Sequence, residues 1–236
     1  MIRAVLFDLG NTLAEYYHTN EFRPILTEAI GAVRDELSRR GLCRVSLESA
    51  LAAALAENQE APDYRFTPMT DRFERIFQVT LTNDSSLAAT TCERFLGPIF
   101  AVGRVYDDAL PTLAQLRESG VLTAIVSNAP WGSPPELWRQ ELRRLGLSDA
   151  VDAVVMCGDV GWRKPAPEIF RHAVNELGCE PADCMFVGDD LRWDIEGSRA
   201  AGMRPMLIDR DGRHAEYKGE RVRELRGVHA ALAAGT

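Results

Sequence analysis

The feature that most constrains this chain is a series of short apolar segments, each followed within two residues by an acidic or hydroxyl residue. Apolar runs at 2–7, 122–126 and 184–187 predict buried strands, and they lead into Asp8, Ser127 and Asp189. Further strands are expected at 153–156 and 205–208, with helices over 109–119, 134–145, 167–177 and 193–201 between them. Strands and helices in alternation predict an α/β fold with a parallel sheet.

The segment between the first and second strands has a different pattern. Apolar residues recur at helical spacing over 25–37, 47–55, 73–79 and 87–100, and no strand pattern interrupts them. We therefore predict two domains. Residues 1–15 and 105–236 form the α/β core domain, and residues 16–104 form a small all-helical domain inserted after the first strand.

The charge balance narrows the range of partners. The 236 residues include 35 acidic and 27 basic side chains, a net charge of −8, which disfavours nucleic acids and anionic membranes as partners. The basic residues of 218–226 alternate with Glu220 and Glu224, a pattern that predicts a solvated helix and not a nucleic-acid surface.

Targeting signals and cysteine pairs are missing from the sequence. The N-terminal apolar run is short, and no apolar stretch is long enough to span a membrane, so we expect a cytoplasmic protein with no membrane partner. The five cysteines form no CxxC pair and are expected to be free, buried, small hydrophobic residues.

Chemistry is expected where the strands end, because ligands of open α/β sheets bind at the carboxyl ends of the strands. Asp8 and Asp189 could supply the carboxylate oxygens that Mg²⁺ prefers. Ser127, backbone N–H groups after it and Lys164 could hold a phosphoryl group. A carboxylate can also attack phosphorus directly. Together these residues predict a phosphoryl-transfer site.

Four segments, in this order, resemble the four motifs of the haloacid dehalogenase-like (HAD) superfamily. They are the loop 8–13 after the first strand, Ser127 with Asn128, GWRKPAPEIF at 161–170 and VGDDLRWDIEGSRAAGM at 187–203. The resemblance implies a Rossmann-like core with a parallel sheet of order 5-4-1-2-3. It also implies a helical cap inserted after strand one, in agreement with the pattern of residues 16–104.

The resemblance also implies roles for individual residues. Asp8 matches the nucleophile, which is also a magnesium ligand, and Lys164 matches the lysine that pairs with the nucleophile and the phosphate. Ser127, with the neighbouring Asn128, matches the phosphate-binding motif. The other metal contacts that the resemblance implies are the backbone carbonyl of Gly10 and the carboxylates of Asp189 and Asp194. Asp190 is expected to support the site without binding the metal directly.

Gly10 is a departure from the family pattern. Phosphatases of the family usually carry a second Asp at this position, which protonates the leaving oxygen and later deprotonates water. Such a group contributes about 10²- to 10⁴-fold to the rate, so slow hydrolysis of alkyl phosphates is expected. A good leaving group, the substrate itself or a residue at the entry of the insertion could replace it. The candidate residues are Glu15, Tyr16, Tyr17 and His18.

Other residues near the motifs are candidate substrate contacts. Trp131 and Arg163 flank the second and third motifs, where an aromatic ring can stack on a ligand and an arginine can bind a second anionic group. Tyr16 and His18 are added because they lie where a cap hinge would face the site.

The function expected is a Mg²⁺-dependent phosphatase of a small phosphorylated metabolite, acting through an aspartyl-phosphate, as a monomer or homodimer. One alternative is a 2-haloacid dehalogenase, since these relatives also lack the second Asp, but they work without magnesium. Another is a non-catalytic phospho-ligand-binding protein. Relatives that cleave carbon–phosphorus bonds need a cap lysine, and no lysine precedes Lys164.

Overall fold

The computed structural model describes residues 1–18, 20–58 and 60–234 and is built on a six-stranded parallel sheet. β1 and β6 at its centre are buried along their whole length, which explains their continuous apolar runs. In spatial order the strands are β5 (Ala153–Met156), β4 (Leu122–Ser127), β1 (Ala4–Phe7), β6 (Cys184–Gly188), β7 (Arg204–Ile208) and β8 (Arg221–Val222).

The five predicted strands are confirmed, and their order matches the one that the family resemblance implies. The sheet has one strand more than the resemblance implies, the edge strand β8. The helix predicted over 218–226 is wrong, because the backbone there pairs with β7: the N–H groups of Leu207 and Asp209 donate to Glu220 and Val222. A helix, α10 (Arg226–Ala234), begins only after this strand.

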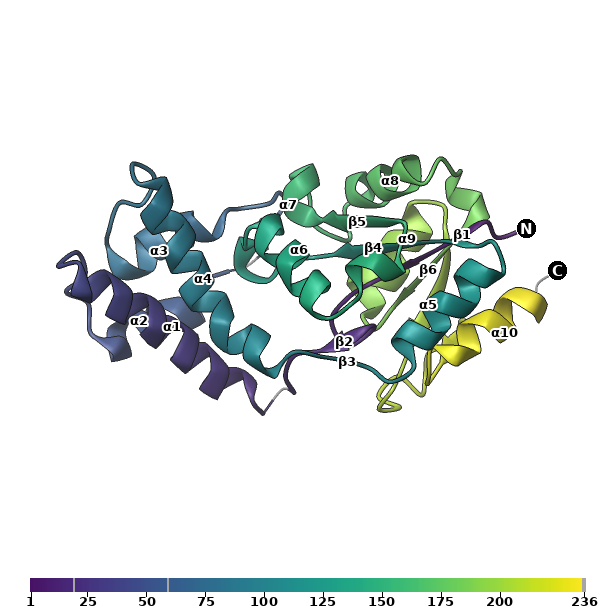
Figure 1. The fold of residues 1–236 in the computed structure, drawn as a ribbon, viewed down its shortest axis with the longest axis horizontal. Coiled ribbons are helices and arrows are strands. Elements are labelled where there is room, and N and C mark those ends of the chain that lie inside the picture. Colours follow the sequence, from purple (N-terminus) through teal and green to yellow (C-terminus); the bar gives the residue numbers. More distant parts are fainter. Residues whose placement is uncertain (19, 59, 235–236) are drawn as a thin grey trace.

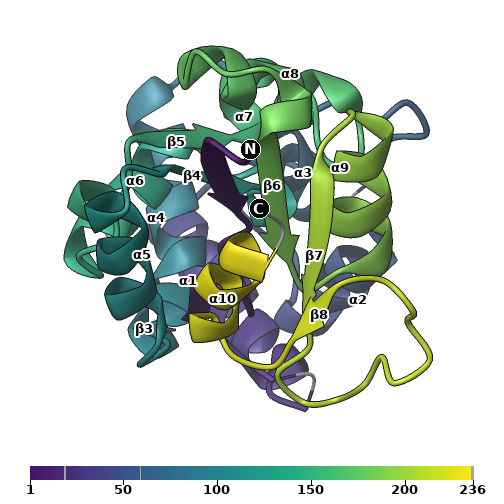
Figure 2. The same cartoon turned by 90° about the vertical axis from the view of Figure 1, so that its right-hand side faces the viewer.

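Helices cover both faces of the sheet (Figure 1). Figure 2 shows α5 (Ala109–Glu118), α6 (Pro135–Arg144) and α10 on one face and α8 (Pro167–Glu176) and α9 (Gly197–Ala200) on the other. The short α7 (Cys157–Val160) follows β5. The helix predicted over 193–201 is divided into a π-helix, η4 (Leu191–Glu196), and α9.

Among the described residues, four helices lie between β2 (Ala14–Glu15) and β3 (Arg104–Val105). These two strands pair antiparallel, so the chain enters and leaves this region at one place. The helices are α1 (Phe22–Arg39), α2 (Leu47–Ala56), α3 (Met69–Phe77) and α4 (Ser85–Val102), and they gather to one side of the sheet (Figure 1). We refer to them as the helical region.

The helical region packs directly against the α/β part. The ring of Phe95 on α4 lies 5.3 Å from that of Trp131, in the 3₁₀ turn η1 (Pro130–Gly132). Gly132 has a φ of +70°, and a Cβ there would lie 1.8 Å from the carbonyl oxygen of Thr67. Close backbone contact at this point therefore requires glycine.

Two further features complete the fold. No helix of the described residues combines the length and apolar character needed to cross a membrane. The five cysteines are free and buried, as predicted.

Candidate active site

Three neighbouring strands bring the predicted acidic and hydroxyl residues to one edge of the sheet. Asp8 follows β1, Ser127 ends β4, and Asp189 follows β6. β1 lies between β4 and β6 in matched register, with Phe7 beside Ile125 and Val187. The side chains that follow these positions therefore meet at one place.

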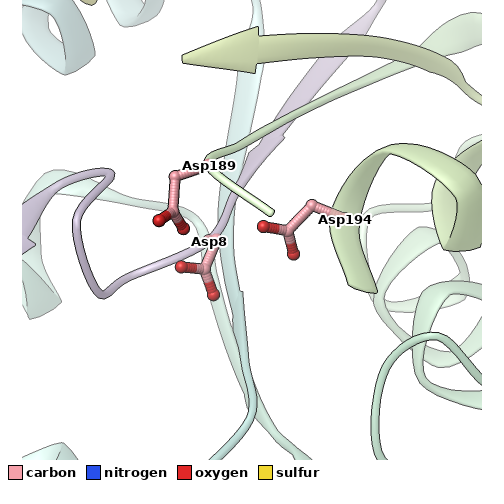
Figure 3. Close-up of side chains that lie close together, drawn as sticks. All are labelled: Asp8, Asp189 and Asp194. Carbon is pink, nitrogen blue, oxygen red and sulfur yellow. The ribbon is translucent and has the colours of Figure 1, made fainter. Parts of the chain in front are cut away.

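Asp194 reaches the same place from η4. A Cβ at Gly188 would lie only 2.4 Å from Cγ of Asp194, so glycine at the end of β6 is what lets this carboxylate approach. Asp8, Asp189 and Asp194 each offer a carboxylate oxygen within 4.8 Å of the others (Figure 3). The sequence motifs predict this set, and the fold assembles it.

Lys164 is the basic partner of the cluster. Its Nζ lies 2.6 Å from Oδ1 of Asp8 and 2.6 Å from Oδ1 of Asp194, and its side chain is 2% exposed. Asn128 fixes the lysine backbone: its Nδ2 donates to the Lys164 carbonyl (3.1 Å), and its Oδ1 accepts from the Lys164 N–H (2.8 Å). Asp8 after β1, Asn128 after β4 and Lys164 in the loop after α7 therefore form one connected polar network.

The cluster carries more negative charge than one lysine balances. Burial, with the charges of Asp8 and Asp194, raises the pKa of Asp189 to about 7, and burial also raises the pKa of Asp194. Burial alone would lower the pKa of Lys164, but Asp194 and Asp8 raise it overall, so the lysine stays charged. When ionised, the three carboxylates and one lysine leave the cluster with a net negative charge.

Two neighbouring residues have other roles. The Asp190 carboxylate caps η4, because its Oδ1 accepts the N–H groups of Arg192 (2.8 Å) and Trp193 (2.7 Å) at the start of that helix. Asn11 was not singled out from the sequence, yet its Nδ2 donates to Oδ2 of Asp189 at 3.2 Å. Its position in the loop after β1 is the one signal that could have suggested it.

The cluster opens into a cavity of about 300 Å³. We call Asp8, Asp189, Asp194 and Lys164 its charged floor. We call Ile99, Pro130 and Trp138 its apolar wall; Ile99 comes from α4 of the helical region and Trp138 from α6. Tyr16 lies beside this wall, and its buried hydroxyl has no hydrogen-bond partner among the described residues. Of the residues singled out from the sequence, those that line the cavity are Asp8, Gly10, Tyr16, Tyr17, Ser127, Asn128, Lys164, Asp189, Asp190 and Asp194.

Trp131, Arg163 and His18 do not line this cavity. Trp131 is buried against Phe95. Arg163 is 5% exposed, and its Nη1 donates to the Ala129 carbonyl at 3.4 Å. His18 lies beside a second cavity of about 440 Å³, with its Nε2 3.0 Å from Glu15. These three residues are close to the motifs in the sequence, but that closeness does not determine whether their side chains face the cavity.

Comparison with known proteins agrees with this geometry. The family model of the haloacid dehalogenase-like hydrolases matches residues 2–202. The chain is 30% identical over 250 residues to the glyceraldehyde 3-phosphate phosphatase of Methanopyrus kandleri, covering 99% of both proteins. The chain therefore belongs to the haloacid dehalogenase-like hydrolases, and the resemblance of its motifs is confirmed.

Solved structures support the same assignment. The crystal structure of a HAD phosphatase from Thermococcus onnurineus is similar over 98% of each chain, with 27% identity and a TM-score of 0.71. That of a 2-haloacid dehalogenase from Pseudomonas syringae is similar over the whole of each chain, with 23% identity and a TM-score of 0.74. At that identity the second likeness concerns the fold alone.

Proposed function

We propose that this protein is a Mg²⁺-dependent phosphatase that hydrolyses a small phosphorylated metabolite through an aspartyl-phosphate at Asp8. The observation that carries the proposal is the charged floor, in which three carboxylates lie within 4.8 Å of one another and a buried lysine pairs with two of them, Asp8 and Asp194. Similarity over 99% of the chain to a phosphatase of glyceraldehyde 3-phosphate supports the reaction class.

The residues of the floor fit a divalent cation. Asp8, Asp189 and Asp194 would hold it, with the backbone carbonyl of Gly10, and the raised pKa of Asp189 indicates the missing positive charge. Oxygen ligands of this kind suit Mg²⁺. When bound, the ion supplies positive charge that offsets the charge of the phosphoryl oxygens.

The chain's own groups then perform the transfer. Lys164 holds the Asp8 carboxylate in place and, with the Ser127 hydroxyl, binds phosphoryl oxygens. A carboxylate oxygen of Asp8 attacks phosphorus as the bond from phosphorus to the leaving oxygen breaks, and that oxygen departs with the electron pair. Water then attacks the phosphorus, which releases inorganic phosphate and restores Asp8.

Gly10 leaves this mechanism without the usual acid and base. Tyr16 and Tyr17 line the cavity, but burial raises the pKa of both phenols, so they stay protonated and cannot act as bases. Glu15 is paired with Arg104 at 2.5 Å and with His18 at 3.0 Å. We infer that the enzyme depends on a leaving group that departs without a strong acid.

A 2-haloacid dehalogenase remains the second candidate, supported by Gly10, because dehalogenases of the family also lack the second Asp. Asp189 and Asp194 favour the phosphatase, because a carbon–halogen bond needs no trio of carboxylates around a cation. A non-catalytic phospho-ligand-binding role has Gly10 alone in its favour. The pairing of Asp8 with Lys164 favours catalysis.

We further propose that residues 16–104, which include the helical region, form a cap domain on a core formed by residues 1–15 and 105–236. Ile99 of α4 lines the cavity, which supports a contribution of this region to substrate binding. The cytoplasmic location and the monomeric or homodimeric state stay predictions of the sequence.

The proposed function is tested by assaying phosphate release from acetyl phosphate with Mg²⁺ and with a chelator. We expect hydrolysis to require the metal and to be lost in Asp8→Asn. Asp190→Asn is the matched control, since its Oδ1 can still accept the two N–H groups at the start of η4. Activity that survives chelation or the Asp8 change would exclude the mechanism.

Release of chloride from 2-chloropropionate would instead favour the dehalogenase.

A further inference from the structure

The cavity above the charged floor carries an inference about the substrate, which rests on the proposed phosphatase function. We propose that the substrate is a phosphate monoester whose remaining part is uncharged and apolar, of the aryl phosphate class, and that Ile99 and Trp138 recognise this part. Three features of the site lead to this conclusion: the composition of the wall, the charges around it and the absence of a side chain at Gly10.

The apolar wall is built from buried and fixed side chains. Ile99 is 5% exposed and Trp138 is 3% exposed. The indole Nε1 of Trp138 donates to Oγ of Ser133 at 2.7 Å, so its polar atom is satisfied within the protein. Its ring meets that of Tyr16 edge to face, with centroids 5.5 Å apart. Such a wall offers carbon surface to a ligand and holds its shape.

The charges around the cavity argue against a second anionic group on the substrate. Among the described residues that line it, Lys164 is the one cation, and its Nζ is held by Asp8 and Asp194. Arg163, the sequence candidate for binding a second anion, is buried elsewhere. A carboxylate or second phosphate would therefore enter an acidic, largely buried site without a partner, which is unfavourable.

The adjoining cavity of about 440 Å³, which shares Asp189 with the first, does not supply such a partner. Arg210 is paired with Asp108 at 2.9 Å and stacks on Tyr106, while Arg213 is paired with Asp211 at 3.5 Å. Glu15, Asp189, Asp209 and Asp211 line the same space, so this neighbour is acidic as well.

Gly10 points to the same class independently. A phenol oxygen, with a pKa near 10 as in tyrosine, leaves more readily than the oxygen of a simple alcohol, whose pKa is closer to that of water at about 15.7. An aryl phosphate therefore suits a site without the usual acid. The size of the cavity, about 300 Å³, is at the small end of ligand pockets and admits a single ring with its phosphoryl group.

The test compares phenyl phosphate with 4-carboxyphenyl phosphate. The carboxylate makes the phenol a better leaving group, so chemistry alone predicts equal or faster hydrolysis of the charged compound. We expect the opposite: a kcat/KM for phenyl phosphate at least tenfold higher. Equal or faster hydrolysis of 4-carboxyphenyl phosphate would overturn the inference.

Acetyl phosphate, which has no ring, separates this failure from that of the proposed function. Lack of Mg²⁺-dependent acetyl phosphate hydrolysis removes the phosphatase and the inference with it. Hydrolysis of acetyl phosphate without the preference for phenyl phosphate overturns the inference alone.

A variant of the wall gives a second test. Ile99→Lys places a cation on the wall, and we expect it to reduce or reverse the preference for phenyl phosphate while acetyl phosphate is still hydrolysed. Ile99→Met, which has a similar volume and adds no charge, measures the effect of losing the isoleucine side chain, and it should reduce the preference less than Ile99→Lys does. If the lysine variant folds, hydrolyses acetyl phosphate and keeps the wild-type preference, Ile99 does not face the substrate and the assignment of the wall is wrong. If it does not fold, the two aryl substrates on the wild-type enzyme still decide.

Discussion

The charged floor and the apolar wall line the same cavity and differ in how they are held. On the floor, Lys164 bridges Asp8 and Asp194 at 2.6 Å each, so these three groups depend on one another's charges. On the wall, Ile99 and Trp138 are held by packing, and the one polar atom of Trp138 is satisfied by Ser133. A change in the floor should therefore affect stability and catalysis together, whereas a change in the wall should alter the choice of substrate.

The largest effect on stability is expected from Lys164→Met. It leaves two carboxylates buried without their cation, and breaking a buried ion pair in this way costs about 3–5 kcal/mol. Denaturant unfolding in the absence of metal measures the loss. The control is Lys218→Met, the same change at the exposed second lysine, which should alter the free energy of unfolding by less than about 0.5 kcal/mol. Equal effects of the two changes would contradict the described network.

A gain of activity is expected from Gly10→Asp. A Cβ at this position meets no heavy atom within 4 Å, so a side chain can begin there without a steric clash. Restoring an acid and base should raise kcat/KM for ethyl phosphate by about 10²-fold or more. Phenyl phosphate, with its better leaving group, should gain less. Gly10→Asn is the matched control without a titratable group, and an equal gain in that variant would rule out proton transfer as the cause.

Metal binding should stabilise the floor in a pH-dependent way. The raised pKa of Asp189 favours the protonated form in the folded, metal-free protein. Its contribution to stability is therefore complete below the usual pKa of 3.8 and is lost as the pH rises through about 7. Mg²⁺ binds the ionised carboxylates, so the increase in Tm on adding Mg²⁺ should be larger at pH 8 than at pH 5.

At a hundredfold excess over Kd the metal contributes about 2.7 kcal/mol to the free energy of unfolding. Asp189→Asn should reduce the response, and Asp190→Asn should keep it. A Tm that does not respond to Mg²⁺ at either pH would contradict the metal site.

The smallest effect is expected from Ser127→Ala. The hydroxyl is 6% exposed at the edge of the cavity, and the loss of one hydrogen bond to a charged phosphoryl group should raise KM by about tenfold, or ~1.4 kcal/mol. The free energy of unfolding should change little. A large loss of stability with an unchanged KM would show that Ser127 supports the fold and does not contact the substrate.

The same contrast separates what the sequence could predict from what it could not. Asp8, Ser127 and Asp189 could be found because strand ends in a parallel sheet converge, and that rule depends on chain order alone. Ile99 and Trp138 lie on buried faces of α4 and α6, as many other apolar residues do. Helical periodicity predicts their burial but cannot distinguish residues that line a cavity from those that fill the core.

Loops were harder still to predict. Trp131 and Arg163 are close to motifs in the sequence, but their side chains point into the packed contact with the helical region and toward Ala129. The segment 218–226 has helical charge spacing, yet its backbone pairs with the open edge of β7. In both cases tertiary contacts that local patterns do not contain determine the outcome.

The central claim is that Asp8 accepts the phosphoryl group, and trapping that species tests it most directly. The protein is mixed with acetyl phosphate and Mg²⁺, quenched in acid within one turnover, digested and analysed by mass spectrometry. We predict a phosphoryl group on the peptide that contains Asp8 in the wild type and none on that peptide in Asp8→Asn. Phosphate release without phosphorylated Asp8, or a phosphoryl group trapped on a different residue, would contradict the mechanism.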